Sequence, residues 1–327
     1  MAFKKAIVNA SDVAATLSDY PSYVDLSRLG ITTLAEAQSV RVYADEAKTT
    51  EWAREIVSAT EMHVKIPSLT STTDIYVDYD GVRADYAVGA TYGRNAVWSD
   101  YVAVMHFDDA TNSTGGTTPS ATSMTYGAGK IGDAGNGAGS GYVTIADSAA
   151  LTFTNGYTVQ CWSFFNALPT TLYRMIHKEN ASPSEYSMYG FDGADQKILH
   201  TVNGARNAIS TSTNTDVNSV WTQFHFVYDR TRARTYLNAV QEASTSYSAN
   251  LNNNAGALSL FGTSAGGAKW NGKMDEFRAR AGGVSANWIT TEYNNQNDEA
   301  TFWGTWTDVG GGATANNSAR RQHLMMM

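Results

Sequence analysis

The fold is decided at the stretch Thr91-Tyr-Gly-Arg-Asn-Ala-Val-Trp-Ser-Asp-Tyr-Val-Ala-Val-Met-His-Phe-Asp-Asp109, because the residues before and after it read as two different β-domains. Its second half, from Tyr101 to Phe107, alternates between two faces as a β-strand does. Both faces are mostly apolar, so we expect this strand inside a sandwich rather than at a solvent-exposed edge. The stretch therefore predicts the junction of two β-domains.

Length and composition indicate an all-β protein with two domains. A chain of 327 residues can form two domains that each bury a core. Its 28 glycines, 18 tyrosines and 5 prolines favour short strands and tight turns over a helical bundle. We predict a β-sandwich at residues 1–98, a second domain at 99–296 and an extended tail at 297–327. The single cysteine, Cys161, excludes an intrachain disulfide and is expected in a core.

Charge and hydropathy exclude two classes of partner. The formal charge is -8, and residues 1–100 hold 9 basic and 14 acidic side chains, so neither domain offers a basic surface for nucleic acid. No apolar run approaches the ~20 residues that a membrane span needs. The N-terminal sequence, Met1 to Ala10, lacks the continuous apolar core of a secretory signal. We therefore expect synthesis in the cytoplasm without a signal peptide.

Short segments rich in β-branched and aromatic residues predict the strands. The region from Ala110 to Gly141 holds 9 glycines and is expected to be a loop with one or two strands. Short helices are expected at Thr33–Gln38 and from Ser285 to Tyr293, with Ser285 as the cap of the second. The predicted strands are Phe3–Asn9, Tyr20–Leu26, Ser39–Ala44, Glu51–Ser58, Glu61–Ile66, Thr73–Tyr79, Tyr101–Phe107, Tyr142–Ile145, Tyr157–Phe165, Leu172–Lys178, Glu185–Phe191, Lys197–Val202, Val220–Asp229, Arg232–Leu237, Ala257–Phe261 and Lys273–Ala279.

Several motifs carry a family resemblance. The second domain contains Tyr157-Thr-Val-Gln-Cys-Trp-Ser163, Trp221-Thr-Gln-Phe-His-Phe-Val-Tyr-Asp229 and Gly272-Lys-Met-Asp-Glu-Phe-Arg278. Together these resemble a laminin-G-like jellyroll of the concanavalin A-type lectins and glucanases. Residues 1–100, with Ser39-Val-Arg-Val-Tyr-Ala-Asp45, resemble an uncharacterised β-domain that often precedes such jellyrolls in bacterial surface and phage proteins. The resemblance implies a two-sheet antiparallel sandwich without implying one function.

One motif departs from the family pattern. The family's Tyr-Leu-Asn-Gly hairpin reads Tyr236-Leu-Asn-Ala239 in this chain. Alanine is poorly suited to the positive φ of a tight primed turn. We therefore expect this turn to be longer or of another type.

The carboxylates do not predict catalysis. Glycan hydrolysis needs two acids that converge on one bond, and hydrolase relatives of the family carry them at alternate positions of one strand. Asp275 and Glu276 are adjacent on a predicted strand and should point to opposite faces. The histidines on predicted strands, His106, His177 and His225, stand in no metal-ligand spacing and are expected to be structural. We predict no catalytic residue and a protein that is not an enzyme.

The resemblance also implies candidate sites for calcium and for glycans. Lectin-like jellyrolls often hold calcium (Ca2+) at the rim, and Asp108, Asp109 and Asp275 could supply its oxygen ligands if the first and last strands pair. Turn capping and salt bridges are the alternative, which we favour. Sugar binding requires exposed aromatic rings, whereas Trp162 and Trp221 fall at core positions of the family. The glycan-binding candidates, which lie near predicted loops or strand ends, are Trp270, Tyr173, Tyr186 and Tyr189.

The C-terminal segment predicts an assembly contact. After the glycines Gly310–Gly312 come two guanidinium groups, which suit acidic neighbours, and flexible apolar side chains, which adapt to irregular grooves. These assembly candidates are Arg320, Arg321, Leu324, Met325, Met326 and Met327. Our leading hypothesis is a non-enzymatic structural or adhesion protein on the surface of a phage particle, with other virion subunits, itself or a cell-surface glycan as partners. A secreted bacterial carbohydrate-binding module is the alternative, and a glycoside hydrolase comes third.

Overall fold

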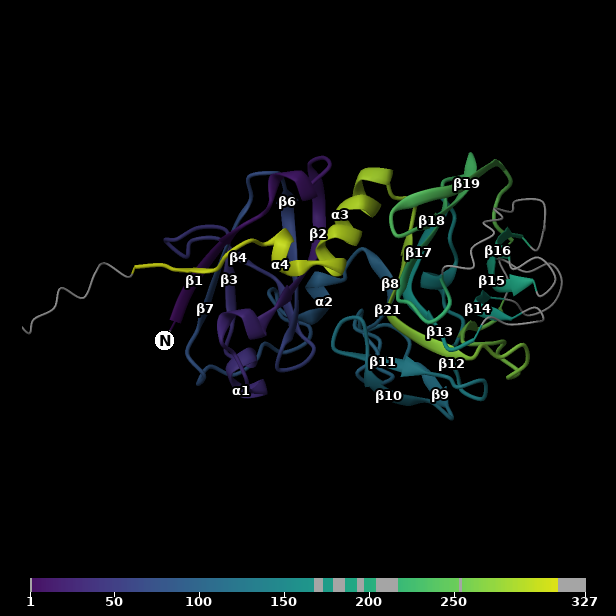
Figure 1. Ribbon diagram of the computed structural model, residues 1–327, viewed down its shortest axis with the longest axis horizontal. Helices are drawn as coiled ribbons and strands as arrows, with labels where there is room; N and C mark the ends of the chain where they lie inside the picture. Colours follow the sequence, from purple (N-terminus) through teal and green to yellow (C-terminus); the bar gives the residue numbers. More distant parts are fainter. Residues whose placement is uncertain are drawn as a thin grey trace, which may run out of the picture.

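Two β-sandwich domains lie end to end, with helix α3 (Ala286–Asn297) between them (Figure 1). The computed structural model describes residues 2–167, 173–178, 186–192, 197–203, 217–252 and 255–310, with only the backbone of 186–192, 197 and 199. The all-β architecture predicted from the sequence is confirmed. In the described part of the chain, no helix combines the length and the apolar character needed to cross a bilayer.

The first domain packs a five-stranded sheet on a three-stranded sheet. The larger sheet has the order β22-β1-β7-β3-β4 and the smaller one β2-β6-β5, with antiparallel pairing throughout. The Thr33 side chain caps the expected helix in a capping box with Glu36. The elements are β1 (Ala2–Ile7), β2 (Leu17–Asp25), α1 (Leu34–Gln38), β3 (Arg41–Tyr43), β4 (Glu51–Trp52), β5 (Arg54–Ile56), β6 (Glu61–Leu69), β7 (Asp74–Tyr79) and α2 (Arg94–Val97).

The second domain is a sandwich of an eight-stranded and a six-stranded sheet. The larger sheet has the order β10-β11-β21-β13-β17-β18-β19, with β8 also paired to β21, and the smaller one β16-β15-β14-β20-β12-β9. The strands are β8 (Tyr101–Met105), β9 (Ser120–Thr122), β10 (Thr125–Ala128), β11 (Asp133–Asn136), β12 (Tyr142–Ile145), β13 (Tyr157–Phe165), β14 (Arg174–Lys178), β15 (Tyr186–Asp192), β16 (Lys197–Val202), β17 (Thr222–Tyr228), β18 (Arg232–Leu237), β19 (Val240–Ser246), β20 (Leu258–Leu260) and β21 (Gly272–Ala281).

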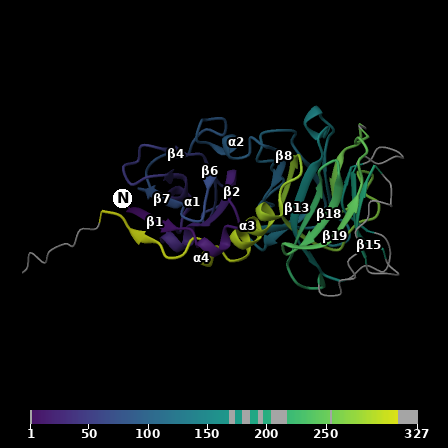
Figure 2. The same cartoon turned by 90° about the horizontal axis from the view of Figure 1, so that it is seen from above.

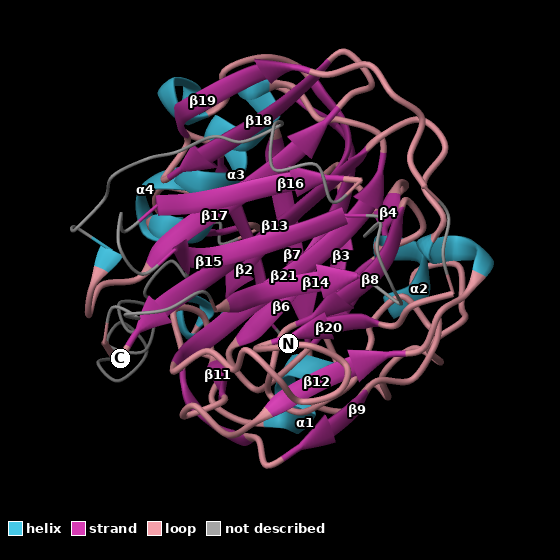
Figure 3. Ribbon diagram, turned by 90° about the vertical axis from the view of Figure 1, so that its right-hand side faces the viewer, coloured by secondary structure: helices cyan, strands magenta, loops and turns pink. Residues whose placement is uncertain are grey.

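The two sheets of the second domain have different surroundings. The eight-stranded sheet faces α3 and the first domain, whereas the six-stranded sheet faces away, as seen from that end of the molecule (Figures 1 and 3). Between the sheets lies one continuous core, which contains Cys161 as expected. The glycine-rich region forms β9, β10 and β11, more strands than expected. β19 was not predicted, because its side chains are partly or largely exposed and give no apolar alternation.

The C-terminal segment differs from the predicted tail at 297–327. Helix α4 (Glu299–Phe302) and strand β22 (Thr307–Asp308) belong to the first domain, along which they run in Figure 2. Phe302 and Trp303 are fully buried in its core, and β22 pairs with β1. The expectation of a tail was wrong up to residue 310, because two adjacent aromatics carry no strand or helix periodicity. The predicted assembly residues, Arg320, Arg321, Leu324, Met325, Met326 and Met327, lie outside the described residues.

The hairpin between β18 and β19 also corrects the sequence analysis. Leu237 pairs with Val240, so only two residues form the turn. Asn238 and Ala239 both adopt positive φ, 47° and 65°, as a primed turn requires. The backbone of Asn238 donates a hydrogen bond to the carbonyl of Gln223, and its side chain accepts one from the Gln223 N–H. This attachment to β17 holds the tight turn despite the unfavourable alanine.

Two truncations test the role of the C-terminal segment. A chain ending at residue 312 keeps α4 and β22, so its free energy of unfolding should equal that of the full chain. A chain ending at Asn297 loses Phe302 and Trp303, whose buried side chains each contribute about 1.5–3 kcal/mol. Urea unfolding followed by tryptophan fluorescence measures both. Equal stability of the two truncations would contradict the assignment of residues 298–310 to the first domain.

Candidate functional site at the domain interface

The site lies where the polar outer faces of two sheets meet. On β6, Met62 and Val64 point into the first core, whereas Glu61 and His63 point outward toward the second domain. On β17, Phe224 and Phe226 point into the second core, and the alternate side chains Gln223 and His225 point toward α3. These outward residues are at most 1% exposed. Strand alternation therefore gives each sheet an outer layer of polar side chains. This layer does not face solvent, because the opposite domain and α3 cover it.

A β-bulge brings two acidic side chains to this layer. The pairing of β21 with β13 shifts between Gln160 and Trp162, and Glu276 has a φ of 49°. Met274 and Phe277 both lie in the core, so the extra residue at the bulge leaves Asp275 and Glu276 outside it. The expectation that these carboxylates point to opposite faces was wrong, because a bulge interrupts the strict alternation of the strand.

The centre of the layer is a group of four buried side chains. Glu61 and His63 come from β6, His106 follows β8 and Glu276 lies on β21, and their ligand atoms all lie within 4.8 Å of one another. His63 Nε2 lies 3.0 Å from Glu61 Oε1 and 3.6 Å from Glu276 Oε1. His106 Nδ1 lies 2.5 Å from Glu276 Oε1 and 3.5 Å from Glu61 Oε1. The two imidazole rings stack with centroids 4.5 Å apart.

A second ring of polar groups surrounds these four. Arg278 Nη2 lies 2.5 Å from Glu276 Oε2, and its Nη1 lies 2.8 Å from Glu292 Oε1. His106 Nε2 lies 3.0 Å from Glu55 Oε2. Glu55 also accepts hydrogen bonds from the Ser113 hydroxyl and the Trp98 indole N–H. The Arg278 guanidinium packs over the Trp98 ring, 4.8 Å from its centroid. Each charged group therefore meets an opposite charge or a hydrogen-bond partner.

Proton affinities at the centre follow from burial and close charges. Burial by itself would lower the pKa of His106, but the carboxylates of Glu276 and Glu55 outweigh it and hold this pKa well above its ordinary value. Burial lowers the pKa of His63 to about 4. For Glu276, the opposing effect of burial is overcome by His106, His63 and Arg278, which hold its pKa well below the usual range. Burial and the nearby Glu276 raise the pKa of Glu61.

Helix α3 fastens the two domains through its polar side chains. Asn295 accepts a hydrogen bond from the Tyr23 N–H of β2 and donates one to the Tyr23 carbonyl, as a neighbouring strand would. On its other side, Gln296 accepts hydrogen bonds from the Trp162 indole and from the Gln223 side chain. Ser285 caps the helix by accepting from the Trp288 N–H, as expected. The helix therefore belongs to the interface rather than to the second domain alone.

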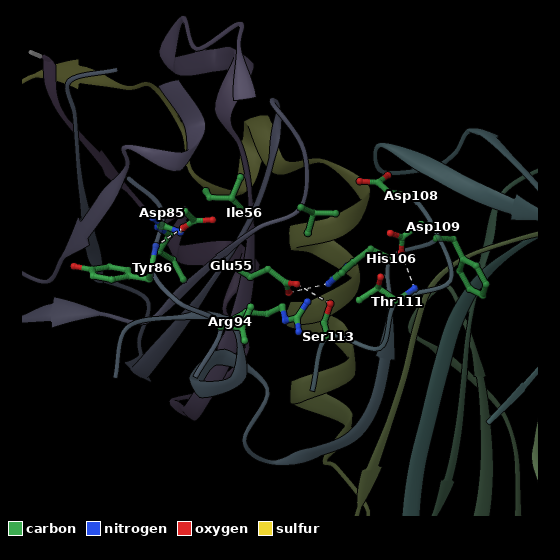
Figure 4. Close-up of a pocket in the computed structure, with 14 residues that line it drawn as sticks. Glu55, Ile56, Asp85, Tyr86, Arg94, His106, Asp108, Asp109, Thr111 and Ser113 are labelled. Atoms are coloured by element: carbon green, nitrogen blue, oxygen red, sulfur yellow. Dashed lines mark hydrogen bonds and ion pairs between the residues drawn. The ribbon is translucent and has the colours of Figure 1, made fainter. Parts of the chain in front are cut away.

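A pocket of about 250 Å³ opens beside this centre (Figure 4). Glu55, His106 and Ser113 reach it from the interface, and Asp108 and Asp109 line it from the start of the glycine-rich region. Its other lining groups include the Arg54–Asp85 ion pair of the first domain. The pocket is polar and connects the outside of the molecule with the ring of His106.

The predicted calcium ligands do not come together as a group of ligand atoms. In the ranges that the structure describes, the only set of three or more His, Cys, Asp or Glu side chains with suitably close atoms is Glu61, His63, His106 and Glu276. Asp275 is fully buried rather than at the rim, and its Oδ2 accepts from the backbone N–H groups of Lys130 and Ile131. Asp108 and Asp109 likewise accept backbone N–H groups, from Asp133 and Thr111. This geometry matches the turn-capping alternative.

The predicted glycan platforms are only partly described. Trp270 is fully buried and stacks on Phe261 with centroids 5.2 Å apart, so the expectation of an exposed ring at this position was wrong. A loop tryptophan at a strand end can fold back into the core, which its position in the sequence does not show. Tyr173 is partly buried against the core. The side chains of Tyr186 and Tyr189 lie outside the described residues, although their strand β15 is described.

Comparison with known proteins identifies the second domain. Residues 136–290 match the model of the concanavalin A-like lectin/glucanases superfamily. The second domain is a laminin-G-like jellyroll. The resemblance noted in its sequence is thereby confirmed, whereas a search of curated proteins gives no match.

Solved structures are similar to the jellyroll. Domain 4 of AbnA, a GH43 extracellular arabinanase from Geobacillus stearothermophilus solved with arabinotriose, superposes with a TM-score of 0.51 at 20% identity, covering 58% of this chain and 97% of that domain. The binding domain of Paraclostridial Mosquitocidal Protein 1 gives a TM-score of 0.47 at 13% identity, covering 60% of this chain and 52% of that one. At such identities the likeness concerns the fold alone.

The sequence analysis missed the four-residue group. Its members come from segments between 2 and 215 positions apart along the chain, so no local spacing could reveal it. The only sequence signal for this group was that Glu61 and His63 occupy alternate positions of a predicted strand. Side chains at alternate positions lie on one face of the sheet.

A pair of substitutions tests the energetic role of Arg278. Arg278→Met leaves Glu276 and Glu292 buried without their guanidinium, and breaking such a buried pair costs about 3–5 kcal/mol. The matched change Arg234→Met removes the partly exposed pair with Asp229 and should cost at most about 1 kcal/mol. Urea unfolding of the full chain measures both. Similar losses for the two variants would show that burial adds nothing to the Arg278 contacts.

Proposed function

We propose that this protein is a non-enzymatic structural or adhesion protein on the surface of a phage particle, which binds a glycan through its jellyroll. The observation that carries the proposal is the state of the carboxylates on the jellyroll's eight-stranded sheet. Asp275 and Glu276 are buried under the first domain and are held by backbone N–H groups and by the His106 and Arg278 side chains. Two acids fixed in this way are not available to a glycosidic bond, which supports a binding role over hydrolysis.

The free side of the jellyroll supports glycan binding. Since the eight-stranded sheet is covered, the six-stranded sheet is the one that faces away from the rest of the molecule (Figure 3). Domain 4 of the arabinanase, which has this fold, was solved with a bound sugar chain, arabinotriose. Tyr173, Tyr186 and Tyr189 belong to or adjoin β14 and β15 of the free sheet. We propose these three tyrosines as the glycan contacts of that sheet.

The location on a particle rests on other features. Residues 1–100 resemble a β-domain known from phage and bacterial surface proteins, and residues 313–327 combine guanidinium and apolar side chains suited to a neighbouring subunit. A bacterial carbohydrate-binding module is the second candidate, because the arabinanase domain belongs to an extracellular bacterial enzyme. Mass spectrometry of purified particles separates the two: presence in virions supports the first, and absence together with secretion by a bacterium supports the second.

Glycan binding is tested with tyrosine variants. The full chain is applied to an array of bacterial surface polysaccharides, and Tyr173→Ala, Tyr186→Ala and Tyr189→Ala are then titrated with the best ligand. Loss of a stacked ring should weaken binding by about 1 kcal/mol, roughly fivefold. Tyr126→Ala, which removes a partly exposed ring from β10, is the control and should bind normally. Binding without any effect of the three variants would place the glycan elsewhere, and product release from the glycan would refute a non-enzymatic role.

Assembly is tested with the chain that ends at residue 312. Both domains keep all their described C-terminal contacts in this variant, so any defect reports on residues 313–327. We expect folded protein with reduced self-association or reduced incorporation into particles, measured by light scattering and by immunoblotting of purified virions. Assembly equal to that of the full chain would refute a role for Arg320, Arg321 and the terminal methionines.

A further inference from the structure

The four-residue group at the interface has the donor set of a transition-metal site. It offers two imidazole nitrogens, from His63 and His106, and two carboxylate oxygens, from Glu61 and Glu276. Imidazole with carboxylate is a ligand combination that suits zinc. The four side chains are between 0% and 4% exposed, so the group is shielded from solvent.

The distances between the donor atoms fit a tetrahedral ion. Four ligands about 2.1 Å from a central zinc ion lie about 3.4 Å from one another. The four distances between imidazole nitrogens and carboxylate oxygens are 2.5, 3.0, 3.5 and 3.6 Å. Small movements of His106 and Glu276 away from each other are therefore enough to seat the ion. We propose that Glu61, His63, His106 and Glu276 form a structural zinc site that joins the two domains.

One oxygen within the group has no partner. Glu61 is 1% exposed and its Oε2 makes no hydrogen bond. Gly132, with a φ of 52°, passes directly over it, and a Cβ at this position would lie 2.4 Å from Oε2. A buried carboxylate with an unused oxygen is costly unless a cation or a donor satisfies it. A zinc ion bound through Oε1 would neutralise the carboxylate to which this oxygen belongs.

Hydrogen bonds and ion pairs from surrounding residues orient the four ligands, as such contacts do around protein metal sites. His106 has Nδ1 toward the centre and Nε2 3.0 Å from Glu55, which fixes the ring orientation. Glu276 has Oε1 toward the centre while Oε2 contacts Arg278 at 2.5 Å. The polar pocket reaches the His106 ring and provides an entry path. With four protein ligands the site is closed, which is typical of structural rather than catalytic zinc.

The site would connect the domains directly. Glu61 and His63 belong to β6 of the first domain, whereas His106 and Glu276 belong to the jellyroll. An ion bound only when all four converge stabilises the docked arrangement by mass action. Zinc should therefore raise the unfolding temperature of the full chain and protect the interface strands from hydrogen exchange.

The experiment uses the full chain without an affinity tag, stripped with chelator and titrated with zinc chloride alone. We expect one zinc ion per chain by elemental analysis and a rise in unfolding temperature that chelator reverses. Cobalt in place of zinc should give the visible absorption of a tetrahedral complex. Glu61→Gln and His63→Gln keep the size of the group and should weaken zinc binding roughly 100-fold or more, and Glu55→Gln should weaken it about 10- to 100-fold.

Matched variants make the outcome decisive. His225→Gln changes a buried interface histidine that contacts Glu292 and lies outside the four, so it should bind zinc like the unchanged chain. Circular dichroism confirms that each variant is folded before titration. No stoichiometric zinc in the unchanged chain overturns the proposal. Zinc binding that survives both Glu61→Gln and His63→Gln also overturns it, because the ion would then sit elsewhere, for example at His323.

Discussion

The arrangement of this protein depends on the burial of one guanidinium. Arg278 is 1% exposed and contacts Glu276 on its own strand and Glu292 on helix α3. Moving a charge out of water costs several kcal/mol, which only well-placed opposite charges offset. The Glu292 contact therefore requires α3 to lie against the jellyroll, and Glu276 requires the bulge in β21. Since α3 also carries Trp288 into the first core, the same contacts fix the orientation of both domains.

Strand alternation predicted much of this fold from the sequence. Met62, Val64 and Ile66 alternate with polar residues, and the structure places them in the first core. The segments Tyr142–Ile145, Tyr157–Phe165, Lys197–Val202 and Arg232–Leu237 are strands with the predicted bounds. Alternation reports which side of a strand faces an apolar core. Alternation does not report what covers the other side of the strand. The polar side chains of Glu61 and His63 predict a solvent-exposed face, but the second domain buries them.

The sequence-based predictions that were wrong failed because of local backbone geometry and of contacts between residues distant in the sequence. The bulge at Glu276 places two adjacent carboxylates on one face, which no side-chain pattern indicates. Ala239 adopts a positive φ because Asn238 is bound to β17, a contact 15 positions away. Trp270 is buried although it adjoins a predicted loop. In each case a tertiary contact outweighs the preference of the residue, so propensity alone gives the wrong answer.

The interface also limits where the jellyroll can bind a ligand. Polar side chains that would line the outer face of a free jellyroll, such as Gln223 and His225, bind α3 instead. Sliding the domains by one residue would break the Arg278–Glu292 contact or separate Asn295 from the Tyr23 backbone. Buried charges of this kind favour one register over its neighbours even where their net contribution to stability is small. A jellyroll held in one register keeps its six-stranded sheet at a fixed direction from the first domain.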